Sequence, residues 1–251
     1  GSAALPTTIL HEWRQLTQHT LLERYGMTEF AMALSNPYNE IVAPRQAGYV
    51  GLPLPSVQVR LVDETTKGVL WDGNSALHRN DDSATPISGA LQVKGPTVFQ
   101  EYWNRPDATR EAFQDGNYFD TGDVAEYNPA LDSYRILGRA SVDILKVGGH
   151  KVSALEIERV LLEHEQIEEV VIVGIPDDTW GQRVGMISRA RKISPPHTIQ
   201  AVGNNNDKMG PLSLEELQDW CESRMAQYKT PTRIVWLDEI PKNAMGKVNK
   251  K

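Results

Sequence analysis

The sequence has 251 residues, of which 40% are hydrophobic and 24% charged, and these values are typical of globular domains with a substantial core. A net charge of -7 argues against a binder of nucleic acid or of anionic membranes, because both require a basic surface. No apolar run approaches the roughly 18 residues of a membrane span. The single cysteine, Cys221, excludes an internal disulfide and fits a reducing compartment.

The first part of the chain predicts a helix followed by strands and loops. A helix is expected over 8–22, where apolar residues recur on one helical face: Ile9, Leu10, Trp13 and Leu16. Residues 70–89 are polar and rich in helix and strand breakers, so we expect an inserted loop there. Alternating or short apolar patterns predict strands in the second half of 49–63, at 90–95 and at 134–139.

From residue 144 the pattern changes to a compact α/β arrangement. Strands are predicted at 144–147, 170–175, 183–190 and 233–237. Helices are predicted to begin at two capping boxes, with Ser153 and Ser213 as N-caps. Cys221 lies on the apolar face of the second helix and is read as a core residue. The order β, α, β, β, α, β predicts a small unit able to fold alone. We therefore expect two domains, 1–139 and 140–251, with a polar insertion at 194–211.

Two common ligand sites can be set aside. The six histidines are scattered along the chain without the spacing of metal ligands, so structural roles are favoured. The Gly246-Lys247 pair resembles the end of a Walker phosphate loop. That loop requires a glycine five residues earlier and a hydroxyl residue directly afterwards, where this chain has Pro241 and Val248.

Two short segments combine glycine with carboxylates and hydroxyls. They are "RYGMTE" at 24–29 and "YFDTGD" at 118–123. Glycine lets the backbone approach a ligand closely, and an adjacent carboxylate can hold ribose hydroxyls or Mg²⁺. Each segment alone is a weak signal, because Thr-Gly-Asp also forms ordinary turns.

The order of five motifs along one chain is more specific. "RYGMTE", "VKGPTVFQEYWNRPDATREAF", "YFDTGD", "GRASVDILKVGGHKVSALEIE" and "PKNAMGK" together resemble the second half of the adenylate-forming superfamily, which includes acyl-CoA synthetases, luciferases and peptide-synthetase adenylation domains. Within it, "ERYGMTE", "GSAALP", "WGQRVG" and "SALEIE" are most similar to malonyl-CoA synthetases. The resemblance implies an α/β (α+β) fold: the C-terminal part of a large domain, then a small, mobile C-terminal domain with a mixed sheet flanked by helices.

The resemblance implies an enzyme that joins a carboxylic acid to CoA through an acyl-adenylate, using Mg·ATP. Tyr25 and Gly26 would contact the adenine, Thr28 the α-phosphate and Glu29 the Mg²⁺. Asp123 and Arg139 would bind the ribose. The small residues Gly1 to Ala4, among them Gly1, Ala3 and Ala4, would line the adenine pocket.

The same resemblance assigns roles in the second domain. Lys247 would be catalytic in adenylate formation, as Thr28 and Glu29 would be. A loop with Lys146, Gly148, Gly149 and Lys151 would face the CoA pantetheine path. Lys242 and Lys250 are read as solvated charges. The family's hinge position falls between Ser141 and Asp143, where the segment is one residue longer than the common form.

Arg24 bears on the acid that is used. A dicarboxylate such as malonate or methylmalonate needs a cation for its second carboxylate, whereas a fatty acid does not. An ordinary ion pair of Arg24 with Glu23 or Glu29 is an equally weighted alternative.

The Ser/Thr/Gly-rich loop that holds the β- and γ-phosphates in this family is absent from the sequence, so we expect a fragment that is inactive alone. Three alternatives stay open: a synthetase for another short or medium acid, a non-catalytic module that binds CoA or a partner, and a peptide-synthetase adenylation domain. The resemblance places the enzyme in the mitochondrial matrix or the cytosol, with small-molecule partners, no nucleic acid and no membrane span.

Overall fold

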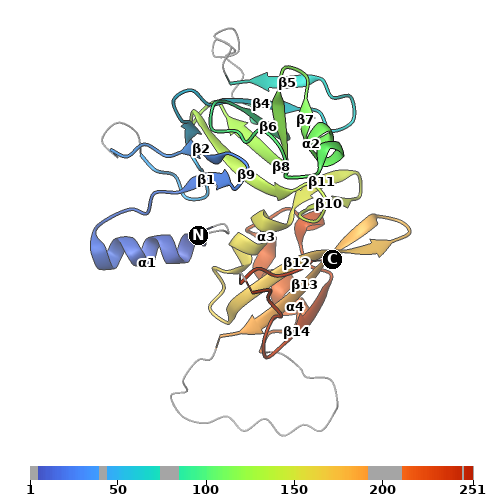
Figure 1. Ribbon diagram of the computed structural model, residues 1–251. Coiled ribbons are helices and arrows are strands. Elements are labelled where there is room, and N and C mark those ends of the chain that lie inside the picture. Colours follow the sequence, from blue (N-terminus) through green and yellow to red (C-terminus); the bar gives the residue numbers. More distant parts are fainter. Residues whose placement is uncertain (1–4, 40–43, 74–84, 192–210, 245, 251) are drawn as a thin grey trace, which may run out of the picture. The chain divides into compact units, whose positions relative to one another are not determined.

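The computed structural model describes residues 5–39, 44–73, 85–191, 211–244 and 246–250. The chain divides into two compact units, the first ending at Ser141 and the second beginning at Val142. Figure 1 shows the elements of each unit. The fold is mixed α/β, as predicted. In the part of the chain that is described, no helix is both long and apolar enough to cross a membrane.

The first unit is dominated by antiparallel strands. Its elements are α1 (Thr7–Thr17), β1 (Arg24–Met27), β2 (Ala31–Ser35), β3 (Leu52–Pro53), β4 (Gln58–Val62), β5 (Val69–Asp72), β6 (Ile87–Lys94), α2 (Pro106–Ala112), β7 (Phe113–Gln114), β8 (Tyr118–Asn128) and β9 (Ser133–Arg139). A six-stranded sheet has the order β5-β4-β6-β8-β7, with β9 also paired to β8. A smaller sheet has the order β1-β2-β3.

The core of the first unit follows from alternation along the strands of the larger sheet. Val59 and Leu61 on β4 pair directly with Val93 and Leu91 on β6, and all four side chains are fully buried. Side chains two residues apart point to the same face of a strand, so this register places one apolar layer on one face. That layer supports the strand β8, which carries the predicted Asp123.

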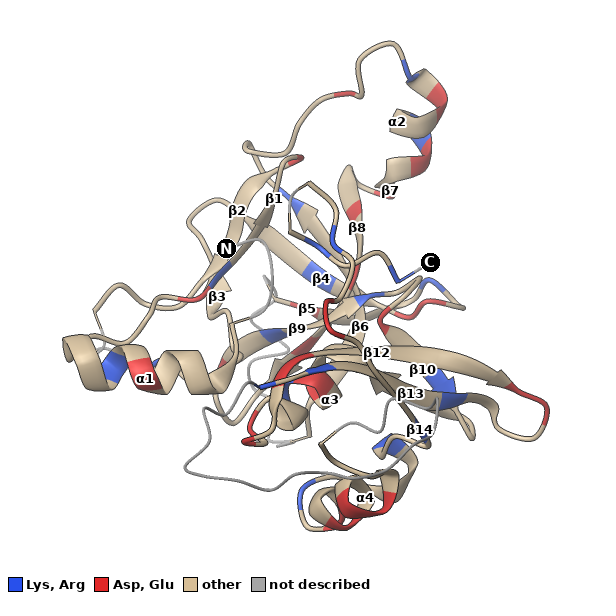
Figure 2. Cartoon of the chain, turned by 90° about the horizontal axis from the view of Figure 1, so that it is seen from below, with Lys and Arg blue, Asp and Glu red and all other residues tan. Residues whose placement is uncertain are grey.

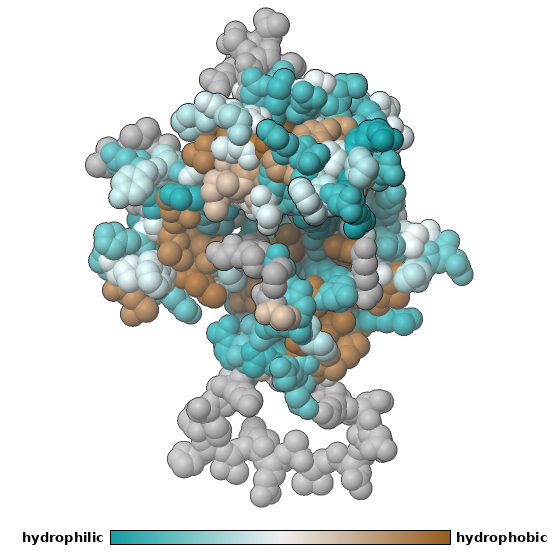
Figure 3. All heavy atoms as spheres, viewed as in Figure 1, coloured by the Kyte–Doolittle hydropathy of each residue, from teal (hydrophilic) through white to brown (hydrophobic). Residues whose placement is uncertain are grey.

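The helix predicted over 8–22 is shorter than expected. α1 ends at Thr17 because Gln18 adopts a left-handed conformation, with φ of 61°, and its N–H bonds to the Arg14 carbonyl. The apolar face is also only partly covered: Leu10 is buried, whereas Leu16 is 84% exposed. Figure 3 shows apolar side chains at the surface where α1 lies.

The prediction of a loop over the whole of 70–89 was wrong at both ends. Val69–Asp72 forms β5, and Ile87 to Gly89 begin β6. Trp71 explains the first error, because its indole N–H donates to the Tyr134 hydroxyl at 2.7 Å and its ring stacks on Tyr127 at 4.2 Å. These partners lie more than 50 residues away in the sequence, so a local pattern of polar residues cannot reveal them. The stretch 74–84 lies outside the described residues, as does the insertion predicted at 194–211 apart from its last residue.

The second unit holds a five-stranded mixed sheet with helices. Its elements are β10 (Ile144–Val147), β11 (His150–Ser153), α3 (Ala154–Leu161), β12 (Ile167–Asp177), β13 (Gly181–Ala190), α4 (Leu214–Glu222), a 3-10 helix (Gln227–Lys229) and β14 (Arg233–Trp236). The strand order is β11-β10-β13-β12, and β14 pairs with β13 in parallel. The four predicted strands and two predicted helices are present, and β11 is an additional strand.

The strand β11 arises from a tight turn that the sequence analysis did not use. Gly148 and Gly149 both have positive φ, at 56° and 82°, as the two central residues of a type I′ hairpin turn require. Because that turn matches the twist of paired strands, the chain returns antiparallel to β10.

Both helices of the second unit begin where the sequence predicted. The Ser153 side chain accepts a hydrogen bond from the Glu156 N–H, and Ser213 forms a complete capping box with Glu216. α4 carries acidic residues (Figure 2) and buries Leu217 and Cys221. Burial raises the pKa of the Cys221 thiol to about 11. The complete burial of its side chain confirms Cys221 as a core residue.

Candidate active site

The "RYGMTE" segment forms a hairpin whose tip is fixed to the core of the first unit. Thr28 and Glu29 lie in the turn between β1 and β2, and the next residue, Phe30, is fully buried. The Phe30 N–H donates to the Met27 carbonyl at 3.2 Å, which closes the turn. The Phe99 N–H donates to the Glu29 carbonyl at 2.7 Å. The tip is therefore held by one buried ring and two backbone bonds, and this leaves the Thr28 side chain exposed.

Gly26 is required by the close approach of the two strands. A Cβ atom at this position would lie 1.8 Å from the carbonyl oxygen of Ala31, on β2. No side chain can occupy that space, so the motif needs glycine here to form the hairpin. The neighbouring Tyr25 packs its ring 5.7 Å from the Phe30 ring, measured between centroids.

Asp123 lies in an irregular part of β8. The pairing register of β8 with β6 shifts opposite residues 121–123, and Gly122 has φ of +70°. The Thr121 hydroxyl donates to the Leu91 carbonyl at 2.8 Å and accepts from the Asp123 N–H at 3.1 Å. The Thr-Gly-Asp segment is thus a bulge within a strand and not the chain-reversing turn considered as an alternative. Bulges re-aim side chains, and this one is occupied by a carboxylate.

A polar network joins Tyr25, Asp123 and Arg139. The Tyr25 hydroxyl donates to Asp123 Oδ2 at 2.6 Å, and Arg139 Nε lies 3.0 Å from Asp123 Oδ1. Arg139 also donates to the Thr121 carbonyl at 2.8 Å. The Asp123 side chain is 10% exposed and that of Arg139 is 48% exposed. The network is therefore rooted in the protein and open at its arginine end.

Electrostatics fix which groups donate in this network. Burial, followed by the negative charge of Asp123, raises the pKa of Tyr25 well above its usual range. Tyr25 is therefore a permanent hydrogen-bond donor at physiological pH. A carboxylate offers about four acceptor positions, so Asp123 can accept from ligand hydroxyls in addition to its protein partners.

Glu29 is held by a tyrosine that the sequence analysis did not single out. The Tyr102 hydroxyl donates to Glu29 Oε1 at 3.1 Å. Burial and this hydrogen bond to Glu29 both raise the pKa of Tyr102. Among the described residues no cluster of three or more His, Cys, Asp or Glu could hold a metal by itself. Mg²⁺ is commonly held by one or two carboxylates together with substrate phosphates, and a lone, oriented Glu29 fits that pattern.

Arg24 begins strand β1 next to Tyr25. Its side chain is exposed, and it makes no ion pair with the residues that the structure describes. The alternative of an ordinary ion pair with Glu23 or Glu29 is therefore not observed. Arg24 and Tyr25 are consecutive residues of β1, where successive side chains point to opposite faces, and the Arg24 guanidinium is exposed.

The predicted CoA loop is the β10–β11 hairpin of the second unit. Lys146 and Lys151 pair directly across it, and both are exposed. At its tip the Gly148 N–H donates to the Trp180 carbonyl at 2.9 Å, and a Cβ on Gly148 would lie 2.6 Å from the Trp180 ring. A Cβ on Gly149 would meet nothing within 4 Å. The hairpin therefore presents two exposed lysines and a glycine tip with open space beside it.

Lys247 lies exposed in a closed turn of the second unit. A bridge pairs Lys242 with Val248, the Asn243 N–H donates to the Lys247 carbonyl at 2.8 Å, and the Lys247 N–H donates to Asn243 Oδ1 at 2.9 Å. Gly246 has φ of +74°, which glycine adopts without strain. The backbone of the turn is bonded to itself, and the Lys247 side chain is presented to solvent.

The interpretation as a solvated charge was wrong for Lys250, whereas Lys242 is exposed as predicted. The Lys250 side chain is only 11% exposed and its ammonium lies 2.6 Å from Asp143 and 2.8 Å from Glu158. Burial alone would lower the pKa of Lys250, but the two carboxylates outweigh it and raise the pKa. Lys242 is more exposed, at 40%, and pairs with Glu169 at 2.6 Å. All of these carboxylates are distant in sequence, which is why the local pattern failed.

Two family models match the chain. The family model for AMP-binding enzymes matches residues 1–103, and the model for the AMP-binding enzyme C-terminal domain matches residues 156–247. The chain belongs to the AMP-binding enzymes. Both parts of the family's architecture are represented, in the order that the sequence motifs predicted.

Individual proteins in this family show which members are most similar to the chain. The chain is 47% identical to the mitochondrial malonate–CoA ligase ACSF3 of Xenopus laevis and 45% identical to that of Mus musculus, over all of this chain and 41% and 40% of those proteins. The crystal structure of ATP-bound MatB from Rhodopseudomonas palustris superposes with a TM-score of 0.76 at 32% identity, over 99% of this chain and 42% of that one. The chain thus spans about two fifths of the length of the relatives that it matches.

The structure brings together part of the predicted site in this AMP-binding enzyme. Tyr25, Asp123 and Arg139 form one network, although Asp123 lies 98 residues and Arg139 114 residues after Tyr25 in the sequence. Gly1 to Ala4 lie outside the described residues. Tyr102 and Glu158 were not predicted. Tyr102 stands inside a quoted motif and Glu158 inside the "SALEIE" helix, so residue type alone gave no reason to choose them.

Proposed function

We propose that this chain is part of an acid–thiol ligase that forms malonyl-CoA from malonate, ATP and CoA. The observation that carries the proposal is the Tyr25–Asp123–Arg139 network, a buried carboxylate held between a hydroxyl and a guanidinium. The network provides acceptors for ribose hydroxyls, in a chain whose family binds AMP. The similarity in sequence to malonate–CoA ligases and in structure to ATP-bound MatB supports the same assignment.

The reaction takes place in two steps. A malonate carboxylate oxygen attacks the α-phosphorus of ATP, which forms malonyl-adenylate and releases pyrophosphate. The sulfur of CoA then attacks the acyl carbon, which forms malonyl-CoA and releases AMP. Negative charge gathers on the α-phosphate oxygens in the first step, so a correctly placed cation accelerates it.

We assign the residues of the first step as follows. Thr28 would contact the α-phosphate, and Glu29, oriented by Tyr102, would hold Mg²⁺. The Mg²⁺ would neutralise charge on the phosphates. Lys247, exposed on its turn, stabilises the developing charge. Tyr25, Gly26 and the small residues at 1–4 would border the adenine.

The second step is assigned to the β10–β11 hairpin. Gly149 leaves open space at the tip, which gives the pantetheine arm of CoA room to pass. Lys146 and Lys151 provide two positive charges beside it. The small domain is proposed to turn between the two steps. Asp143 is buried and ion-paired within the second unit, so we place the pivot before it, at 140–142.

The acid is proposed to be malonate because Arg24 is available to a second carboxylate. Methylmalonate carries the same two carboxylates and would use the same contact. The relatives named above are described as mitochondrial, and we propose a mitochondrial location for this protein.

The test is an acid panel with the full-length protein. Pyrophosphate release and CoA thioester formation are measured with malonate, methylmalonate, acetate and a medium-chain fatty acid. Malonate is expected to give the highest kcat/KM. A preference for the fatty acid, or for acetate over both dicarboxylates, would refute the malonate assignment while leaving the ligase assignment intact.

A further inference from the structure

The Lys250 ammonium connects the end of the described chain to three elements of the second unit. It contacts Asp143, directly before β10, and Glu158 on α3. Glu158 Oε1 also accepts from the Ile172 N–H of β12 at 2.8 Å, and the Asp143 carbonyl accepts from the Ala154 N–H at 2.7 Å. We call Lys250, Asp143 and Glu158 the tail anchor. Each of its side chains is at most 14% exposed.

The turn that carries Lys247 lies between this anchor and a second ion pair. On its other side Lys242 contacts Glu169 of β12, and Glu169 also pairs with Arg189. The Lys242 pair is partly exposed, and exposed pairs hold side chains weakly. The buried tail anchor, three residues after Lys247, therefore supplies the firmer attachment of the turn.

We propose that Lys250, through Asp143 and Glu158, is a positioning residue that fixes the Lys247 turn for adenylate formation, an inference that rests on the function proposed above. A buried ionic cluster contributes little net stability compared with apolar residues of the same size, because the charges lose their hydration. The cluster does fix the position of the Lys250 side chain, because an ammonium between two oriented carboxylates has one favoured position. The catalytic ammonium of Lys247 needs such a fixed place, because small displacements of a catalytic group cost rate.

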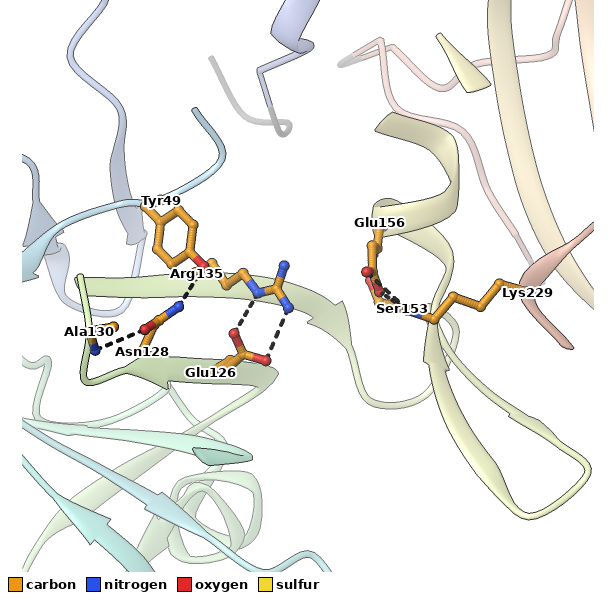
Figure 4. A network of polar contacts seen from close by, with 8 residues as sticks. All are labelled: Tyr49, Glu126, Asn128, Ala130, Arg135, Ser153, Glu156 and Lys229. Carbon is orange, nitrogen blue, oxygen red and sulfur yellow. Dashed lines mark hydrogen bonds and ion pairs between the residues drawn. The ribbon is translucent and has the colours of Figure 1, made fainter. Parts of the chain in front are cut away.

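The test compares Lys250→Met with Lys229→Met in the full-length protein. Lys229 makes a matched ion pair, to Glu156 on the same helix α3, at 2.9 Å (Figure 4), and it does not contact the turn. Two quantities are measured: hydrogen exchange of the amides at 243–248, and single-turnover rates of adenylate formation and of CoA attack on pre-formed malonyl-adenylate.

Lys250→Met is expected to speed exchange in the turn about tenfold or more, because the anchored state no longer protects it. Adenylate formation should fall about 10- to 100-fold through misplacement of Lys247, with CoA attack within about threefold of wild type. Lys250→Arg keeps the charge and should recover most of the adenylation rate. Lys229→Met should change neither the exchange at 243–248 nor the adenylation rate.

Two outcomes overturn the proposal. One is unchanged exchange and adenylation in Lys250→Met; the other is an equal loss in both half-reactions, which indicates a general structural role. If Lys250→Met does not fold because two carboxylates lack their cation, the double variant Lys250→Met with Asp143→Asn replaces it, with the same expected results. If the wild-type protein forms no acyl-adenylate, the proposed function fails, whereas the exchange data still decide whether Lys250 holds the turn.

Discussion

Arg24 is the side chain on which the choice of acid rests. It is exposed, it has no ion-pair partner among the described residues, and it precedes Tyr25, whose hydroxyl binds Asp123. A guanidinium pairs well with a carboxylate because it can donate two parallel hydrogen bonds. The role of Arg24 as a substrate contact therefore stays a proposal, and kinetics can test it.

Arg24→Ala should impair the use of malonate far more than the use of acetate. Loss of the partner of a desolvated carboxylate costs about 2–5 kcal/mol, whereas acetate has no second carboxylate to lose. Steady-state kcat/KM for both acids measures the difference. The matched control is Arg110→Ala on α2, where the guanidinium is exposed and forms an ion pair with Asp107 of the same helix. An equal loss for malonate and acetate would show that Arg24 serves the fold.

Asp123 is expected to govern nucleotide affinity. Asp123→Asn keeps the shape of the side chain but removes its charge, and charged hydrogen bonds contribute about 1.5–3 kcal/mol each. ATP affinity measured by calorimetry should fall by that amount. Glu126→Gln is the control, because Glu126 lies on the same strand and pairs with Arg135 of β9 at 2.7 Å (Figure 4). Asp123 would lie outside the nucleotide site if both variants bound ATP like the wild type.

Among the elements, the β10–β11 hairpin shows how a two-residue turn depends on a neighbour. Gly148 and Gly149 have similar backbone conformations, yet only Gly148 faces a side chain, the Trp180 ring. The turn conformation therefore requires glycine at both Gly148 and Gly149, and the close contact with Trp180 is a second reason for glycine at position 148.

Gly148→Ala should destabilise the protein more than Gly149→Ala. Both variants force an L-residue into the left-handed region, which costs about 1–2 kcal/mol. Only Gly148→Ala adds a clash with Trp180, for about 1–3 kcal/mol more. Denaturant unfolding gives both values, and Trp180→Ala should relieve part of the Gly148→Ala loss in a double-mutant cycle. Equal losses for the two glycine variants, with no coupling to Trp180, would contradict this account.

The molecule taken as a whole consists of two units with separate cores, and the proposed reaction divides between them. The residues proposed to bind nucleotide and acid lie in the first unit, and Lys247 and the hairpin proposed to face CoA lie in the second. Each half-reaction therefore has residues that the other does not use.

Lys247→Ala should separate the two half-reactions. The loss of a cation at the α-phosphate typically slows adenylate formation about 10²- to 10³-fold. CoA attack on pre-formed malonyl-adenylate has no need of that cation and should change less than about threefold. Single-turnover kinetics of the full-length protein measure both steps. The control Lys67→Gln changes an exposed lysine of the first unit. An equal loss in both steps would mean that Lys247 supports the fold.

The family and much of the fold of the second unit could be predicted from local signals. The order of five motifs indicated the family, the serine caps placed both helices of the second unit, and apolar runs placed its strands. These signals work because capping, turn formation and strand alternation depend on residues only a few positions apart. The hairpin strand β11 was within reach too, since Gly148-Gly149 is a strong signal for a type I′ turn.

Other features were decided by the tertiary structure alone. Lys250 is an exposed tail lysine by sequence, yet folding brings it against Asp143, 107 positions earlier. Trp71 turns a polar stretch into strand β5 by bonding to Tyr134, 63 positions later. The sequence determined which residue types carry charge, hydroxyl or ring, and where the chain can turn. Which of them meet was decided by packing, because an ion pair or a buried hydrogen bond forms between neighbours in space, whatever their separation along the chain.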